Sequence, residues 1–307
     1  MASKSKAAQA KRSKAESKIN FYLIAIPVLA FVIKLITMAN IRNVDGGFLG
    51  GWLGADGENY LSGVDGLLAQ GYLSDKSILS YWPAGYPILI WLLTKISLTY
   101  VIALISFTQT IFYAYASYYF VKQLRGTRLQ PYMFWIAIAI AFNPTLSLSS
   151  LAVGYESPIA ACMLMVVGLI MKSVQSPHDR GFISRVVAAG FFSALATLMQ
   201  PRWILTTLVI ALIWALITKG RKEQALILVG VVGIMALAPA IMIDRNVRSI
   251  DKAVISTNLG VTMNIGAGPD TKGGYAKTGE SVPCEPVPPA TAVTDNELVK
   301  CVIKWYI

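Results

Sequence analysis

The chain has 307 residues, of which 55% are hydrophobic and 14% are charged, and its mean hydropathy is +0.57. An average soluble domain carries about 25% charged residues, so this composition excludes an ordinary soluble protein and predicts a polytopic membrane protein. The net charge of +11 suits either nucleic acid or an anionic membrane surface, and the position of the basic residues decides between the two.

The first 20 residues, MASKSKAAQAKRSKAESKIN, hold six Lys or Arg against Glu16 alone, and an apolar run follows directly at 21–39. A basic segment before a span is typical of the cytoplasmic side. The run is long for a cleaved signal peptide, contains Lys34 and lacks a clear small-x-small cleavage site. We therefore expect 1–20 to be a basic cytoplasmic tail and 21–39 a retained helix, from which Lys34 snorkels to the interface.

The next segment, 40–83, carries five acidic and two basic residues. Within it Tyr60, Val64 and Leu67 recur at helical spacing, and Asp65 falls on the opposite side. This pattern predicts an amphipathic juxtamembrane helix that lies on the outer surface of the membrane with its apolar face down.

Asp56 stands directly before this helix, in the sequence GADG. Asp is a preferred N-cap residue, and a cap contributes about 1 kcal/mol. A turn of small residues also lets the backbone come close to a ligand. The spacing alone leaves both interpretations of Asp56 open.

Seven more apolar runs follow the first. They lie at 86–97, 99–120, 131–148, 157–171, 184–200, 203–218 and 224–243. The run 86–97 begins next to Pro83 and contains Pro87, and its 12 residues are too few to span, so we expect a half-helix or a re-entrant segment there.

Lys and Arg cluster in three of the connecting segments, which predicts that these segments are cytoplasmic. The clusters are Lys122/Arg125/Arg128, Lys172/Arg180/Arg185 and Lys219/Arg221/Lys222. The chain then crosses the membrane about seven times within a transmembrane domain at 21–243, and the loop 40–83 and the tail 244–307 lie outside. The inner segments hold 15 basic and 3 acidic residues, and the tail holds 7 of each. The excess positive charge is therefore explained by the orientation of the chain in a cell membrane, and we expect no nucleic-acid partner.

Other chemistries find little support in the sequence. The one histidine, His178, falls on the predicted cytoplasmic side, which argues against a Ser-His-Asp site facing the outer loops. Cys162 lies in an apolar run, whereas Cys284 and Cys301 lie in the tail, where either a disulfide or two free thiols is consistent with the sequence.

A resemblance to a known family rests on the order of several short motifs. Asp56 and Tyr60 form an Asp-x-x-x-Tyr element, Gly71 follows about ten residues later, and PAGYP comes next. This order resembles the GT-C fold glycosyltransferases that use polyprenyl-phosphate sugars, in particular the protein O-mannosyltransferase and aminoarabinose transferase group. NPTLSLSSLAVGYESP, with Glu156, resembles their Pro-containing hairpin, and DRNVRSIDKAVISTNLGVTMNIGAGP resembles the sequence after their seventh span. The resemblance covers roughly 20–280.

The resemblance implies an all-α bundle of about seven transmembrane helices and an integral membrane enzyme that transfers a sugar with inversion. The donor is a polyprenyl-phosphate sugar, and the acceptor is a lipid, a glycan or a protein on the outer side. Asp56 matches the general base that deprotonates the acceptor hydroxyl. Arg202 in QPRW and Arg245 in DRN fall on the same predicted side and suit a phosphodiester. The other expected substrate-binding residues are Glu58, Tyr60, Glu156 and Asn246.

Several alternatives stay open at this point. Arg202 is also explained by snorkelling, Arg245 with Asp244 by an interfacial anchor, and Glu156 by capping of the helix near Ser157. No cofactor is certain, and a divalent cation on Asp56, Glu58 and Glu156 is left open.

Two other functional classes also remain. Relatives in this family commonly continue with further spans, whereas this sequence stops at KCVIKWYI, so we expect a truncated or minimal seven-span version. That departure leaves room for an inactive membrane scaffold. A transporter is the other class, although the ionisable residues gather in the outer loops and not at mid-membrane.

Overall fold

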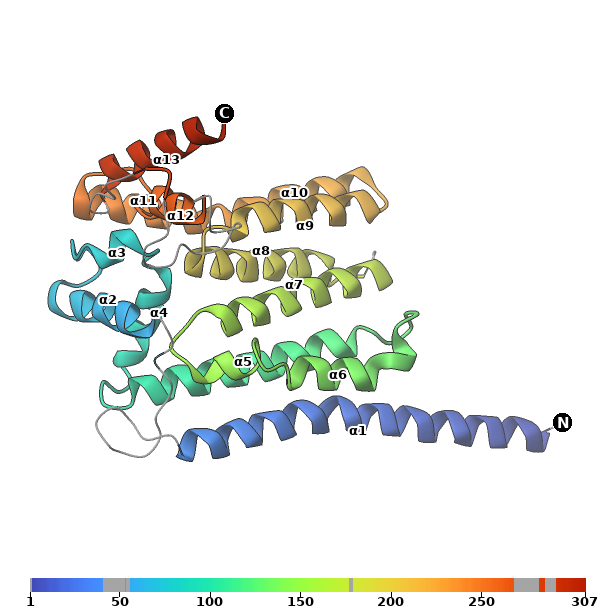
Figure 1. The fold of residues 1–307 in the computed structure, drawn as a ribbon. Helices are drawn as coiled ribbons and strands as arrows, with labels where there is room; N and C mark the ends of the chain where they lie inside the picture. The colour runs from blue at the N-terminus through green and yellow to red at the C-terminus, as the bar shows by residue number, and fades with distance from the viewer. Residues whose placement is uncertain (1, 41–52, 54–55, 177–178, 268–281, 285–290) are drawn as a thin grey trace. The chain divides into compact units, whose positions relative to one another are not determined.

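The computed structural model describes the whole chain except residues 1, 41–52, 54–55, 177–178, 268–281 and 285–290, so His178 lies outside the described part. The described residues form helices and no strand (Figure 1). The fold class expected from the composition is therefore confirmed at the level of a helical protein. The chain divides into two compact units: unit 1 is Met1–Glu58 with Leu92–Ala238, and unit 2 is Asn59–Trp91 with Pro239–Ile307.

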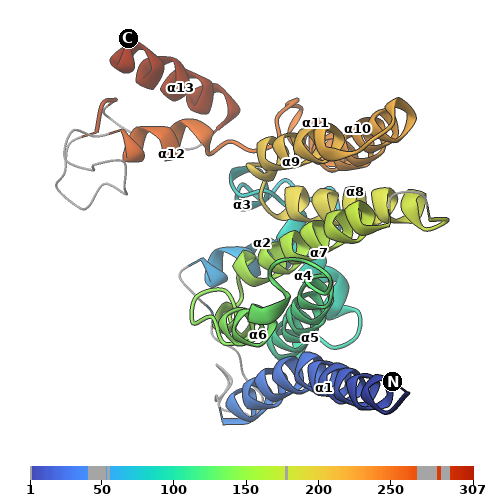
Figure 2. The same cartoon turned by 90° about the vertical axis from the view of Figure 1, so that its right-hand side faces the viewer.

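Unit 1 is built from long, apolar helices. Its main elements are α1 (Ala2–Asn40), α5 (Val101–Lys122), η1 (Gln130–Tyr132), α6 (Met133–Ala141), η2 (Leu148–Leu151), α7 (Glu156–Gln175), α8 (Phe182–Met199), α9 (Trp203–Ile217) and α10 (Arg221–Met235). Within the unit α1 packs on α5, α5 on α7, α7 on α8 and α8 on α10, and Figures 1 and 2 show these helices side by side in that order.

Five helical segments of the described chain are long and apolar enough to cross a membrane. They are Phe21–Asn40, Val101–Lys122, Glu156–Gln175, Phe182–Met199 and Arg221–Ile250, and three shorter apolar helices are Gly85–Thr94, Gln130–Ala141 and Trp203–Ile217. Each of the eight apolar runs in the sequence thus contains a helix. The ten-residue Gly85–Thr94 agrees with the expected short segment at 86–97.

The run 131–148 differs from expectation because its helix stops at Ala141. The side chain of Asn143 accepts hydrogen bonds from the backbone N–H groups of Thr145 (3.0 Å) and Leu146 (2.7 Å), which folds the chain into a turn. Pro144 has no N–H group to continue the helix. Hydropathy alone therefore overestimates the length of this helix.

A polar stripe on α5 satisfies the backbone that follows this turn. Ser106 Oγ donates to the carbonyl of Leu151 (3.0 Å), Gln109 Nε2 donates to that of Ala152 (3.4 Å), and Thr110 shares a hydrogen bond with Ser150 (3.0 Å). These α5 positions are spaced by three and four residues, so they share one helix face. The stripe holds η2 and the residues after it against α5.

Glycine at one helix crossing allows a close approach in unit 1. A Cβ on Gly190 of α8 would lie 2.9 Å from Cβ of Ile234 and 3.2 Å from the carbonyl oxygen of Gly230, both on α10. Small residues at such crossings let helix backbones pack closely in membranes. Trp214, Phe182 and their neighbours fill the apolar core that surrounds this crossing.

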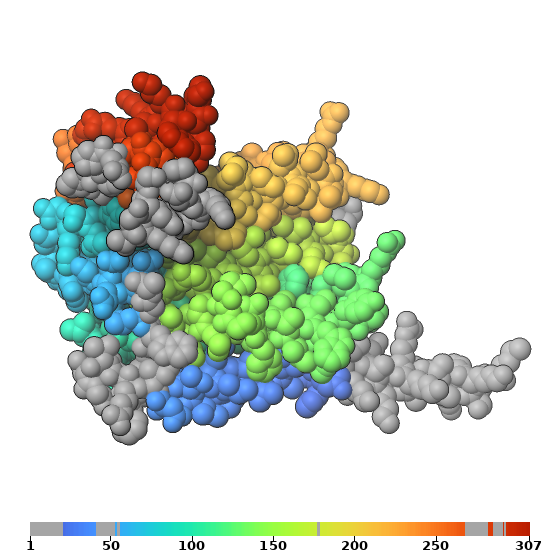
Figure 3. Space-filling model, viewed as in Figure 1, coloured from blue at the N-terminus to red at the C-terminus, as the bar shows by residue number. Residues whose placement is uncertain are grey.

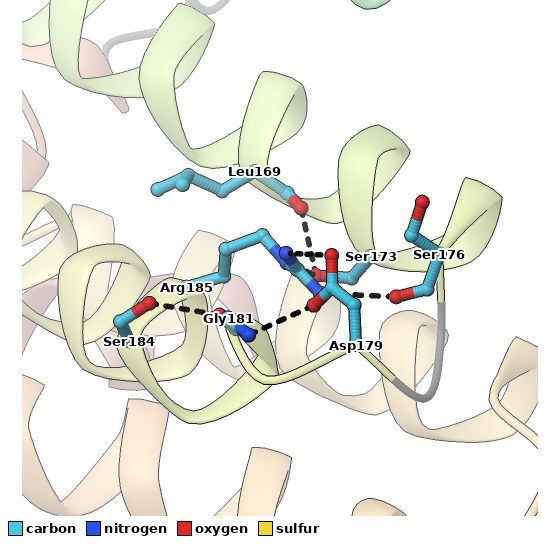
Figure 4. A network of polar contacts seen from close by, with 7 residues as sticks. All are labelled: Leu169, Ser173, Ser176, Asp179, Gly181, Ser184 and Arg185. Carbon is cyan, nitrogen blue, oxygen red and sulfur yellow. Dashed lines mark hydrogen bonds and ion pairs between the residues drawn. The ribbon is translucent and has the colours of Figure 1, made fainter.

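The turn between α7 and α8 is closed by Arg185, whose side chain is buried (Figure 4). Its Nε donates to Ser173 Oγ (2.8 Å), and its two terminal nitrogens donate to the carboxylate of Asp179 (3.0 and 2.6 Å). Asp179 also accepts from the backbone N–H of Gly181 (3.0 Å). Arg185, a member of one of the three predicted cytoplasmic clusters, thus stabilises the turn through its hydrogen bonds.

Unit 2 contains most of α2 (Gly57–Gln70), α3 (Ile78–Tyr81), most of α4 (Gly85–Thr94) and α11 (Leu237–Ile250), and α12 (Leu259–Gly266) and α13 (Ala292–Tyr306). The expected amphipathic helix forms as α2, and it ends at Gly71, which has a positive φ of 77°. Its apolar face packs on protein: Leu67 lies in a core with Leu79 and Ala84. The expectation that this face lies down on lipid is therefore wrong for the described part of α2.

The tail forms a small helical assembly within unit 2. Cys284 and Cys301 form a disulfide, which decides between the two alternatives left by the sequence. The Asn264 side chain donates to the carbonyl of Cys284 (2.9 Å) and accepts from its N–H (3.0 Å). Asp295 accepts from the N–H of Gly260 at the start of α12 (2.6 Å), and burial raises the pKa of this carboxyl.

The Arg185 contacts generate a prediction about stability and pH. Hydrogen bonds from Arg185 hold the pKa of Asp179 below its ordinary value. A carboxyl with a depressed folded pKa stabilises the fold above its unfolded pKa, about 3.9, and loses that contribution as the pH falls through the lower folded value. Asp179→Asn should therefore lower the midpoint of thermal unfolding at pH 7 but have little effect below the folded pKa. Thermal unfolding between pH 2.5 and pH 7, with Asp65→Asn as an exposed control, checks this, and an undiminished difference at the acid end would contradict it.

Candidate functional site

The predicted site residues divide between the two units. Asp56, Glu58, Glu156 and Arg202 belong to unit 1, and Tyr60, Arg245 and Asn246 belong to unit 2. The convergence of all seven residues stays a prediction, and the geometry of each group is described within its own unit.

In unit 1 the turn that carries Asp56 lies against the segment that precedes α7. A Cβ added to Gly57 would lie 3.4 Å from the carbonyl oxygen of Val153 and 3.5 Å from its Cβ. Asp56 is half-buried at the N-cap position of α2. Among the described residues its carboxylate has no hydrogen-bond or ion-pair partner, so the cap interaction proposed as one alternative is not formed.

The segments that carry Glu156 and Arg202 are joined by a hydrogen bond. Gln200 Nε2 donates to the hydroxyl of Tyr155 (2.9 Å). Glu156 is the first residue of α7, and Arg202 stands directly before α9. Both charged side chains are exposed. Three of the four predicted residues of unit 1 are thus carried by segments that touch one another.

Glu156 folds back over the backbone of Gly154. Its Oε2 atom lies 2.5 Å from the position that a Cβ on Gly154 would take. The α7 helix begins at Glu156 with no side-chain cap, so the expected alternative of a capping role near Ser157 is not realised. A residue without a side chain is needed at position 154 for the carboxylate to lie where it does.

An apolar cavity of about 820 Å³ extends from Glu156 along one face of α7. The α7 positions that line it are Glu156, Ile159, Ala160, Met163, Leu164 and Val167, which follow the three- and four-residue spacing of one helix face. The eleven steps along the helix from Glu156 to Val167, at 1.5 Å each, give the groove a length of about 16 Å. Tyr113, Asn143, Tyr155 and Trp203 line it as well, so the wall carries several polar groups besides the carboxylate of Glu156.

Lys34 lies on the other side of one wall of this cavity. It is 4% exposed, and its ammonium group lies 4.8 Å from the ring centroid of Tyr113, a residue that lines the cavity. In the described chain no carboxylate lies within ion-pair distance of it. The expectation that Lys34 snorkels to the interface is therefore wrong, because the side chain is buried in unit 1 and held by a cation–π contact.

In unit 2, Arg245 and Asn246 serve as a bridge between loops. Arg245 is 1% exposed and donates to the carbonyls of Ser74 and Leu79 and to the side-chain oxygen of Asn246. Asn246 in turn donates to the carbonyl of Val254 (2.8 Å). The alternative of an interfacial anchor does not fit Arg245, because its side chain is buried within unit 2, while Asp244 lies 3.6 Å from Arg248. As it stands, Arg245 holds the fold of unit 2, and its contact with a donor phosphate stays a prediction.

The remaining predicted residues lie on α2. Tyr60 is buried and packs edge-to-face on Tyr86, with 5.0 Å between the ring centroids. Glu58 is exposed. In the described ranges no group of three or more His, Cys, Asp or Glu side chains is placed to hold a metal ion.

Sequence reasoning did not single out Tyr155 and Trp203, which line the cavity. It also missed Gly154, over which Glu156 folds, and Gln200, which donates to Tyr155. The sequence held one signal for the cavity. The α7 residues that line it after Glu156 are spaced by three and four positions and so share one helix face, although α7 as a whole is apolar. Tyr155 and Gln200 could not have been paired, since 45 residues separate them in the sequence.

Comparison with protein-family models, with curated proteins and with solved structures finds no match.

The position of Glu156 generates a prediction about Gly154. In Gly154→Ala the new methyl group displaces the carboxylate, which is the end of a flexible side chain, so the fold should persist with a change of under about 1 kcal/mol in the free energy of unfolding. The displaced carboxylate should react faster with a water-soluble carbodiimide, as measured by mass spectrometry. Gly233→Ala, where a Cβ meets nothing within 4 Å, is the control. An unchanged labelling rate at Glu156 would contradict the prediction.

The buried ammonium group of Lys34, which has no carboxylate within ion-pair distance among the described residues, generates a second prediction. Lys34→Met removes the cost of burying the ammonium group and keeps a long apolar stem, so the free energy of unfolding should rise by about 1–3 kcal/mol. Thermal unfolding in detergent measures the change, and Lys95→Met, at an exposed position, should have little effect. A lower unfolding midpoint for Lys34→Met would mean that the ammonium group stabilises the fold.

Proposed function

We propose that this protein is an integral membrane glycosyltransferase of the GT-C type, which transfers a sugar from a polyprenyl-phosphate donor to an acceptor on the outer side of the membrane. The observation that supports it most is the arrangement within unit 1. Carboxylates and a cation are carried by contacting turns, and Glu156 lies on the wall of an apolar groove about 16 Å long. A lipid-linked sugar has the matching chemistry, since it joins a long apolar chain to a charged and hydroxylated head group.

In this proposal the isoprenoid chain lies along α7, against Ile159, Met163 and Val167. Burial of its methylene and methyl groups drives binding at about 25 cal/mol per Å². The head group then lies among Glu156, Tyr155 and the residues near Arg202. A guanidinium is suited to the phosphate because it offers paired, charge-assisted hydrogen bonds.

The transfer step assigns the base role to Asp56. Its carboxylate takes the proton of the acceptor hydroxyl as the acceptor oxygen bonds to the anomeric carbon of the sugar. The bond from that carbon to the phosphate oxygen breaks on the opposite face, which inverts the configuration, and the polyprenyl phosphate leaves with the electron pair. A carboxylate without a hydrogen-bond partner among the described residues is suited to accept the proton.

Glu156 has a supporting part in this scheme. Its carboxylate accepts hydrogen bonds from sugar hydroxyls and orients the ring, because it is held at the cavity by the close approach to Gly154. The proposal includes a bundle of about seven crossings, with the loop 40–83 and the tail outside. The disulfide supports an outer tail, since disulfides persist in oxidising compartments.

Sugar transfer by the purified protein tests this function. With polyprenyl-phosphate donors that carry radiolabelled sugars and with a membrane extract as acceptor, the wild type should give a labelled product. Asp56→Asn should lower the rate by a factor of about 100 or more, as expected for loss of a general base. Asp65→Asn, a matched change at an exposed position of α2, should leave the rate unchanged.

Each of the other outcomes identifies a different function. Full activity of Asp56→Asn would remove Asp56 from the base role. Absence of transfer with every donor would contradict the enzyme and favour a membrane scaffold. Flux of a labelled solute into proteoliposomes, without transfer, would favour a transporter.

A further inference from the structure

A second cavity of unit 1, of about 480 Å³, is separate from the groove along α7. It lies where the loop between α5 and α6 meets the beginning of the apolar part of α1. Figure 3 shows α6 and its preceding loop, in green, lying on α1, in blue. We call this cavity the α1–α6 notch. Its residues come from α1 (Tyr22, Leu23), from the loop and η1 (Thr127, Gln130, Pro131) and from α6 (Met133, Phe134, Ala137).

The notch has an apolar floor. Leu23, Met133 and Ala137 are each at most 4% exposed. Tyr22 and Phe134 stand at the side, 38% and 36% exposed, with their rings edge-to-face at 5.1 Å between centroids. Aromatic residues of this kind gather at the level of the lipid head groups. The floor and the aromatic wall therefore suit an acyl chain that enters from the interface.

The opposite side of the notch is polar. Gln130 is exposed, and its Oε1 accepts from the backbone N–H of Gly126 (2.7 Å). This hydrogen bond fixes the amide, so Nε2 remains as a donor, and within the described residues it has no acceptor. The hydroxyl of Thr127 donates to the carbonyl of Leu124 (2.7 Å), so on this side of the notch the side chain of Gln130 offers a donor to a ligand.

The sequence around the notch has an excess of positive charge. Lys122, Arg125 and Arg128 lie in or next to the loop, and no Asp or Glu occurs from residue 101 to residue 155. Arg128 directly follows Thr127 of the rim and is exposed. The preceding segment, 1–20, adds six basic residues against one acid. A partner that carries negative charge and an apolar chain is complementary to this surface.

We propose that the α1–α6 notch binds one anionic phospholipid of the leaflet predicted to be cytoplasmic. One acyl chain lies against Leu23, Met133 and Ala137, Gln130 donates to an ester or phosphate oxygen, and Arg128 pairs with the phosphate. A zwitterionic lipid places an ammonium group beside the basic loop and binds less tightly. This site is independent of the proposed transfer reaction, because none of its residues line the groove along α7.

Native mass spectrometry of the delipidated full-length protein in a non-ionic detergent tests the proposal. The wild type should retain one phosphatidylglycerol more tightly than phosphatidylcholine. Arg128→Ala should weaken phosphatidylglycerol binding about five-fold, as expected for about 1 kcal/mol per basic residue near a charged head group. It should weaken phosphatidylcholine binding less, because the choline ammonium group already offsets part of the attraction between Arg128 and the phosphate. Gln130→Trp, which fills the notch from an exposed position, should weaken both lipids.

The controls separate a site from general attraction. Lys222→Ala removes one exposed charge from another predicted cytoplasmic cluster and should change binding less than two-fold. Glycerol 3-phosphate, which has the phosphate but no acyl chain, should not compete. Equal retention of the two lipids by the wild type, or an equal effect of Lys222→Ala and Arg128→Ala, would overturn the proposal. Because Arg128 is exposed, its variant remains informative even where Gln130→Trp fails to fold.

Discussion

The hydrogen bonds from the polar stripe of α5 are the interaction on which the candidate site depends. Backbone groups that are buried outside a helix must find hydrogen-bond partners within the protein. The chain leaves helical geometry after Ala141, and Ser106, Gln109 and Thr110 supply the partners for the segment that follows. That segment leads directly into Val153 and Glu156. The position of the groove mouth is therefore set by three uncharged side chains that do not themselves reach it.

This dependence explains why the sequence predicts the helices better than the site. Each of the eight apolar runs contains a helix, and the run at 86–97 forms a helix of only ten residues, as expected. The helices α12 and α13 lie outside these runs, so hydropathy did not report them. The end of α6 could not be placed in the same way, since hydropathy stays high through Leu146 and Leu148 although Asn143 and Pro144 turn the chain. The crossing count of about seven stays a prediction, with five segments of sufficient length and composition among the described residues.

The same contrast applies to the individual charged residues. Asp56 was singled out beside a capping alternative, and among the described residues its carboxylate forms no cap hydrogen bond, which favours its availability for a ligand. Arg245 was chosen by residue type, yet its burial and its hydrogen bonds to the carbonyls of Ser74 and Leu79 describe a structural guanidinium. Sequence shows which side chains can bind a phosphate, but only tertiary packing shows which of them are already committed. For this reason Arg202, which is exposed, is the better candidate of the two.

The excess positive charge consequently has several physical roles and not one. Of the 27 basic residues, 15 lie in the N-terminal segment 1–20 and in the three basic connecting segments, and their positions fit the predicted orientation of the chain in the membrane. Arg185 shows that such a cation can also close a turn, through Asp179 and Ser173. Lys34 follows neither pattern, since it is buried behind Tyr113 without a carboxylate among the described residues. The cation–π contact with Tyr113 offsets part of the cost of burying this charge, and because Tyr113 also lines the groove along α7, Lys34 places a positive charge next to the wall of that groove.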